Sequence, residues 1–95
     1  MNEARAYHGS CVLNRVVYVF CGMDNGTYLN SVERWDGGMF WDLIDTNIPV
    51  RTSCGAIAVN YDEIIVFGGR DSKKRLRDVW LLNTETKVTK VISKE

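Results

Sequence analysis

The sequence predicts an all-β protein built from two four-stranded antiparallel sheets, and three observations support this fold class. Short β-branched and aromatic runs alternate with turn residues, and no segment has the sustained apolar spacing of a helix. The run at residues 16–24 has a second copy at residues 64–71, and each copy passes through glycine to an aspartate. The offset of 47 residues that aligns Gly22 with Gly69 also aligns further positions. Two copies of one unit therefore fill nearly the whole chain.

In the first unit, small residues at 9–11 predict a strand in a crowded place, where neighbouring backbones come close together. Asn14-Arg15 is a two-residue break that is typical of a hairpin turn. Turn-forming residues at 24–26 predict a loop, and Gly37-Gly38 predicts the next turn. The four expected strands cover residues 7–13, 16–21, 31–36 and 39–44, and the expected loop covers residues 23–30.

The second unit repeats this order after a connection at residues 45–50 that contains Pro49. Arg5 aligns with Arg51 at an offset of 46 rather than 47, so one residue is inserted, and we place it near Tyr61-Asp62. The four expected strands cover residues 52–60, 63–68, 77–83 and 87–92.

Composition limits the classes of partner. The 95 residues make one domain at most, and 12 basic residues balance 12 acidic ones. Nucleic-acid and anionic-membrane surfaces usually carry a cluster of Lys and Arg, and the basic segment 70–77 is short and lies in a loop. No stretch is apolar and long enough to cross a bilayer. We therefore expect neither a nucleic acid nor a membrane as partner.

The candidate chemical groups predict no catalytic site, no metal site and no cofactor. His8 is the one histidine, and a metal site needs several ligands that converge. The serines lack a partner histidine, and turn capping explains carboxylates such as Asp24 and Asp71. The three cysteines have no metal-like spacing, which favours reduced, buried thiols in a cytoplasmic or nuclear protein.

These features together resemble the kelch repeat, the four-stranded blade of a β-propeller. The marks are Phe67-Gly68-Gly69 with Asp71, the segment 31–36, and Trp41 placed six residues after Trp35. The resemblance implies two blades of an incomplete ring, at residues 5–48 and 49–95, after a loose N-terminal end at residues 1–4. It also implies that Trp35 and Trp41 belong to the core.

The chain departs from the kelch pattern at several positions. Cys21 replaces the first glycine of a pair, so a side chain must fit a backbone position that favours glycine. Leu82 and Val88 stand where aromatic residues are expected, and Trp80 stands where the first unit has Glu33. The outer half of the second unit should therefore pack differently.

Two blades are fewer than the four to eight that usually close a propeller. Two broad sheet faces would remain bare, and such faces indicate an interface. We therefore expect the missing blades to come from a longer chain, from another polypeptide, or from self-association, in which three copies would give six blades.

The resemblance implies a non-catalytic protein–protein interaction module, like the kelch substrate adaptors of ubiquitin ligases or the actin-associated kelch scaffolds. Two alternatives are a fragment of a kelch-like propeller enzyme and a degenerate remnant without binding activity. In kelch adaptors, partners lie over one end of the ring, on the residues that lead into the first strand and on the loop between the second and third strands. The matching positions are Arg5, Tyr7, Arg51, Thr52 and Ser53 at the blade entrances, and Met23, Tyr28, Arg70 and Arg75 in the loops.

For two pairs of these residues, a structural role is the alternative. Arg5 and Arg51 could each pair with a neighbouring blade, while Arg70 and Arg75 could belong to an ordinary solvated loop. If the loops do bind, the segment 70–77 favours an acidic peptide, because it carries five positive charges and one negative charge.

Overall fold

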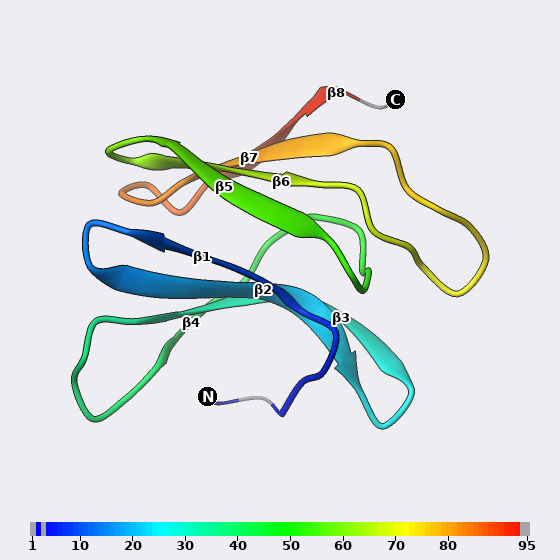
Figure 1. Cartoon of the computed structure of the whole chain (residues 1–95), viewed down its shortest axis with the longest axis horizontal. Coiled ribbons are helices and arrows are strands. Elements are labelled where there is room, and N and C mark those ends of the chain that lie inside the picture. The colour runs from blue at the N-terminus through cyan, green and yellow to red at the C-terminus, as the bar shows by residue number, and fades with distance from the viewer. Residues whose placement is uncertain (1, 3, 94–95) are drawn as a thin grey trace.

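The computed structural model describes residues 2 and 4–93, which form two four-stranded antiparallel sheets, as the sequence predicts (Figure 1). Each sheet is a meander in which consecutive strands are neighbours. The first sheet contains β1 (Gly9–Leu13), β2 (Val16–Asp24), β3 (Thr27–Trp35) and β4 (Asp42–Ile44). The second sheet contains β5 (Gly55–Asn60), β6 (Glu63–Phe67), β7 (Val79–Asn83) and β8 (Thr89–Ser93). The two sheets stack face to face, with β1 of one beside β5 of the other.

The predicted loop at residues 23–30 is wrong, because a tight hairpin stands in its place. Strand β2 continues to Asp24 and β3 begins at Thr27, so only Asn25 and Gly26 form the turn. Both turn residues have positive φ, 49° and 81°, which suits the twist of a two-residue hairpin. Met23 and Tyr28 are consequently paired strand residues and do not lie in a loop.

The first strand of each sheet starts later than predicted. Ala6 and Thr52 form isolated bridges with Met23 and Arg70, and regular pairing begins only at Gly9 and Gly55. The residues after the two bridges, Tyr7 and Ser53, turn the chain with φ of 57° and 59°. Several other predicted bounds also differ from the observed ones, most of all at the fourth strand, which covers only Asp42–Ile44.

The inserted residue of the second unit lies in a strand and not in the predicted turn. Pairing between β5 and β6 shifts between Ala58 and Asn60, after which Asn60 pairs with Glu63. A β-bulge absorbs one extra residue in this way without changing the turn. The turn at Tyr61-Asp62 therefore keeps two residues, like the turn at Asn14-Arg15.

The core lies between the sheets. Phe20 from the first sheet and Ile64, Val66 and Leu82 from the second are fully buried, and Ile48 joins them from the connection. A Cβ atom on Gly9 would lie 2.8 Å from the Cys54 carbonyl oxygen, which confirms the predicted crowding of the first strand.

Trp35 and Trp41 do not belong to this core, so that prediction is wrong. Their rings stack on each other at a centroid distance of 5.9 Å, outside the buried cluster, and Trp35 remains 36% exposed. Leu82, which aligns with Trp35, is the residue that fills the core from the second sheet. The smaller side chain in the second unit is thus the better buried one.

Part of the predicted loose end is anchored. The Asn2 side-chain amide donates to the Trp41 carbonyl oxygen at 2.8 Å, and the Asn2 main-chain nitrogen donates to Glu33. Residues 1 and 3 lie outside the described residues, as do residues 94–95 of the second unit. The blade boundary between residues 48 and 49 remains a prediction.

Candidate protein-interaction surface

The segments that the sequence singles out for binding lie at one end of the stacked sheets. Figure 1 shows the β2–β3 hairpin, the β6–β7 loop and the turn before β5 on the right, and the β1–β2 and β5–β6 turns on the left. Hydrogen bonds join several of these segments: Thr52 and Arg70 exchange main-chain bonds of 2.8 and 3.0 Å, and the Ser53 N–H donates to the Tyr7 carbonyl oxygen at 2.7 Å. The predicted grouping of entrance and loop positions therefore exists in space.

Arg51 joins the two sheets and is not a surface residue. Its main chain bonds to the first sheet, accepting from the Gly22 N–H at 2.8 Å and donating to the Leu29 carbonyl oxygen at 3.2 Å. Its guanidinium is fully buried and bonds to both carboxylate oxygens of Asp78, at 2.6 and 2.7 Å, and to the Gly68 carbonyl oxygen. These bonds from Arg51, with one from the Trp80 indole, hold the pKa of Asp78 below its usual value.

Arg5 occupies the equivalent place in the first sheet. Its buried guanidinium donates to Glu33 at 2.8 Å, to the Ser31 hydroxyl at 3.1 Å, and to the carbonyl oxygens of Cys21 and Ser31. Both arginines are therefore structural, but each pairs within its own sheet, which corrects the expectation of a neighbouring blade as partner. Neither guanidinium is exposed for contact with another protein.

Among the predicted contact residues at the two entrances, one in each unit is exposed. Tyr7 is 68% exposed and Ser53 is also exposed, whereas Thr52 is buried by its bridge to Arg70. Tyr7 and Ser53 align with each other, and both hold the left-handed conformation that costs a non-glycine residue free energy. Asn14, Arg15 and Lys87, in turns at the opposite end, hold the same conformation, so it does not by itself distinguish a binding residue.

The β6–β7 loop is a closed turn whose cations point outward. Asp71 caps it: one carboxylate oxygen accepts from the main-chain nitrogens of Lys73 and Lys74, at 2.8 and 2.9 Å. These two bonds lower the pKa of Asp71. Within the part of the chain that the structure describes, no loop cation has a carboxylate oxygen within 4.0 Å. The exposed cations of the loop are Arg70, Lys73, Lys74, Arg75 and Arg77.

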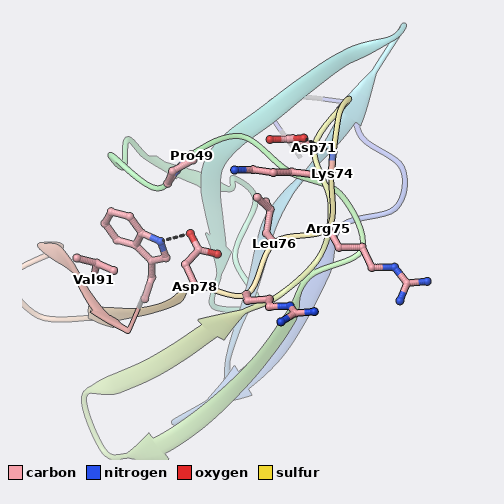
Figure 2. A pocket seen from close by; sticks show the side chains of 9 residues that line it. Pro49, Asp71, Lys74, Arg75, Leu76, Asp78 and Val91 are labelled. Carbon is pink, nitrogen blue, oxygen red and sulfur yellow. Dashed lines mark hydrogen bonds between the residues drawn. The ribbon is translucent and has the colours of Figure 1, made fainter. Parts of the chain in front are cut away.

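An open groove of about 720 Å³ lies beside this loop (Figure 2). Pro49, Leu76, Trp80 and Val91 supply its apolar part, and the Trp80 indole is fixed by donating to Asp78 at 2.7 Å. In Figure 2 the Lys74 side chain extends toward Pro49, whereas the Arg75 guanidinium points away from the groove. The remaining lining residues are Asp71, Lys74, Arg75, Arg77 and Asp78.

The groove is not predicted from the sequence. In the sequence Trp80 is only a departure from Glu33, whereas in the structure this tryptophan forms a wall of the groove beside Asp78. The signal was available, because a large aromatic residue that replaces a paired carboxylate must find a new apolar contact.

Two of the three thiols meet the expectation of burial. Cys21 and Cys54 are buried where the sheets meet, whereas Cys11 is only half-buried. The Cys21 thiol lowers the pKa of Cys54 to about 7, with help from the Arg51 charge, and the contact raises the pKa of Cys21. Cys21 also holds φ at 60°, close to the 67° of Gly68, so a side chain occupies the glycine conformation there.

Among residues 2 and 4–93, no three His, Cys, Asp or Glu side chains gather in a way that could hold a metal ion. The same residues include no helix that could cross a membrane.

A four-stranded meander that stacks on its own repeat and presents loops at one end is the blade of a β-propeller. The kelch-motif family model matches the chain at residues 4–36 and 51–88, which is most of its length. The chain therefore belongs to the kelch-repeat family. It is 30% identical over 86 residues to Beta-scruin of Limulus polyphemus, covering 90% of this chain and 9% of the relative. The chain thus spans about a tenth of the curated relative that it matches.

Proposed function

We propose that the chain is a non-catalytic kelch interaction module whose loop end binds an acidic peptide. The observation that carries this proposal is the β6–β7 loop. It exposes five cations, three of which (Lys74, Arg75 and Arg77) line a partly apolar groove, and the carboxylate of its turn is engaged by main-chain nitrogens. Kelch repeats commonly mediate protein–protein interaction, which agrees with this assignment.

The groove and the cations would act on different parts of the peptide. An apolar side chain would lie against Trp80, Leu76 and Val91, where burial of apolar surface supplies affinity. Carboxylates on either side would meet the loop cations. Lys74 and Arg77 lie at the rim, and Arg70 and Arg75 extend the positive charge beyond it, where attraction raises the association rate and adds to the affinity. A peptide with acidic residues around one large apolar residue is therefore the ligand class that fits.

The predicted contact residues divide into two groups. Tyr7, Ser53, Arg70 and Arg75 are exposed at this end, and we propose them as direct contacts, with half-buried Met23 and Tyr28 beside them. Arg5, Arg51 and Thr52 support these residues from below by holding the strand ends in place. The family associates such a module with substrate recognition for ubiquitin ligases and with cytoskeletal scaffolding in the cytoplasm or nucleus. An acidic-peptide site would serve either role.

The test is fluorescence anisotropy with a labelled peptide of alternating Glu and Asp around a central Leu. Replacing both Arg70 and Arg75 with Ala should weaken binding about tenfold at 50 mM salt, and less at 300 mM salt, where charges are screened. The matched control is Arg15→Ala with Lys87→Ala, which removes two exposed cations from turns at the opposite end. Equal affinity of the two double variants, or no binding by the unmodified chain, would overturn the proposal.

A further inference from the structure

The contact between the two sheets depends on a main-chain bridge. Gly22 in β2 faces Leu29 in β3. The hydrogen-bond ladder between β2 and β3 is interrupted at this pair, because the main chain of Arg51 lies between the two residues. The Arg51 carbonyl oxygen accepts from Gly22, and its N–H donates to Leu29. One residue of the second unit thereby completes the ladder of the first sheet.

The second sheet has the same opening at Gly69 and Leu76. The Leu76 N–H donates to the Gly69 carbonyl oxygen at 2.8 Å, so the two residues face each other as Gly22 and Leu29 do. Gly69 has φ of 93°, close to the 97° of Gly22. Among the described residues, none accepts from the Gly69 N–H and none donates to the Leu76 carbonyl oxygen. The Gly69 N–H and the Leu76 carbonyl oxygen can therefore both bond to the main chain of one residue from another chain segment.

The outer face of the second sheet, which points away from the first sheet, has the pattern of a buried face. Phe67 aligns with Phe20 and Ile57 with Cys11, and both Phe20 and Cys11 pack in the core between the sheets. On the outer face, however, Ile57 is 54% exposed and Phe67 is 43% exposed. An apolar face of this kind indicates an interface.

The first unit carries the complementary features. Arg5 aligns with Arg51, and its guanidinium is already held by Glu33 as Arg51 is held by Asp78. Val12 aligns with Ala58 and lies on the face of the first sheet that points away from the core, where it is 63% exposed. The first unit of one molecule can therefore repeat, on another molecule, the contact that the second unit makes with the first.

We propose that the outer face of the second sheet binds the first sheet of a second copy of this chain, head to tail. The main chain at Arg5 of the second copy bridges the Gly69 N–H and the Leu76 carbonyl oxygen, as Arg51 bridges Gly22 and Leu29 within one copy. Such a contact joins two different surfaces, so it closes into a ring or continues as a polymer. A ring of four to eight blades takes about two to four copies. The contact uses the main-chain carbonyl oxygen of Leu76 but none of the cationic side chains of the basic loop, so loss of those cations separates it from peptide binding.

The test is complementation of two blocked variants, measured by light scattering. Ile57→Lys places a charge on the outer face of the second sheet, and Val12→Glu places one on the outer face of the first sheet. Each variant alone should lose self-association by at least about tenfold, because an unpaired charge is costly to bury. An equimolar mixture should form a one-to-one dimer, because each variant retains the surface that the other has lost. The dimer should not grow further, because its two remaining surfaces are the blocked ones. Val88→Lys, at an exposed turn position, is the control and should associate like the unmodified chain.

The unmodified chain should increase in mass with concentration, and a chain that remains monomeric would overturn the proposal. A mixture that forms no dimer, while each variant keeps the β-sheet circular-dichroism spectrum, would also overturn it. If either charged variant unfolds, Ile57→Gln and Val12→Gln replace them with the same expected outcomes. The Arg70→Ala, Arg75→Ala variant should associate normally, which separates this proposal from peptide binding.

Discussion

The two sheets hold their leading arginines by different means. Arg5 in the first sheet pairs with Glu33 in β3, whereas Arg51 in the second sheet pairs with Asp78, just before β7. By alignment, Ser31 corresponds to Asp78 and Glu33 to Trp80, so the carboxylate has moved by two residues. Positions two apart on a strand share a face, which is why either can reach the arginine. The comparison shows that the repeat preserves a buried ion pair on one face and not a particular residue.

The exchange also changes the surroundings of each pair. The side chains of Arg5 and Glu33 are both fully buried, whereas the Asp78 side chain is 16% exposed at the groove. Moving the acid to position 78 leaves position 80 for a tryptophan, which forms one wall of the groove. The second sheet thus keeps the pair between the buried arginine and a carboxylate, and it gains an apolar groove.

The largest effect is expected from removing the fully buried acid. Glu33→Ala should lower the free energy of unfolding by about 3–5 kcal/mol, because it leaves the buried Arg5 charge without its carboxylate. Adding Ser31→Asp places an acid where the second sheet has one, 3.1 Å from Arg5 by the present hydroxyl, and should recover most of the loss. Urea unfolding of both variants measures the two changes in the free energy of unfolding. If Ser31→Asp gives no recovery, the two positions are not interchangeable.

A smaller effect is expected from glycines that differ in their surroundings. A Cβ atom on Gly69 would lie 2.4 Å from the Thr52 carbonyl oxygen, whereas on Gly26 it would meet nothing within 4 Å. Gly69→Ala should cost about 3 kcal/mol, and Gly26→Ala about 1 kcal/mol from its positive φ alone. Thermal unfolding distinguishes the two variants. Equal costs would mean that the strand end of the second sheet moves easily away from its entrance segment.

The smallest effect is a pH dependence that belongs to the second sheet. The Arg51 guanidinium lowers the pKa of Asp78 in the folded state, so the pair stabilises the protein above the unfolded value of about 4. That stabilisation is lost as pH falls through the folded pKa. Asp78→Asn should therefore flatten the loss of stability as the pH falls below about 4. Asp71→Asn is the comparison, because main-chain hydrogen bonds in an exposed turn lower the pKa of Asp71, whereas a buried guanidinium lowers that of Asp78. Urea unfolding across this pH range should show a smaller change of slope in Asp71→Asn than in Asp78→Asn.

Much of the fold is encoded locally, and the sequence therefore predicts it. The repeated run that ends at Gly22 and Gly69 predicts the strands, and the small residues near Gly9 predict close packing. The β2–β3 hairpin was missed because pairing shifts register between Phe20 and Gly22 and then resumes beyond the glycine. The turn residues around Asn25-Gly26 predict a loop, but the same two residues also fit a two-residue hairpin turn, which is the one observed.

The candidate site was less predictable because its contacts join distant residues. Arg51 and Asp78 are 27 positions apart, and nothing near either residue indicates the other. The groove depends on the meeting of Pro49 with Trp80 and Val91, from three separate segments. The position of the basic loop could be predicted, because its turn is capped by its own aspartate.

The most direct test of the equivalence of the two sheets compares amide hydrogen exchange at Gly22 and Gly69. In dilute solution the Gly22 amide, which donates to Arg51, should exchange at least about a hundredfold more slowly than the Gly69 amide. Raising the protein concentration should slow exchange at Gly69 alone, as a second copy fills the opening. Equal exchange rates at the two glycines in dilute solution would contradict the account, because the bridge at Arg51 would then protect nothing.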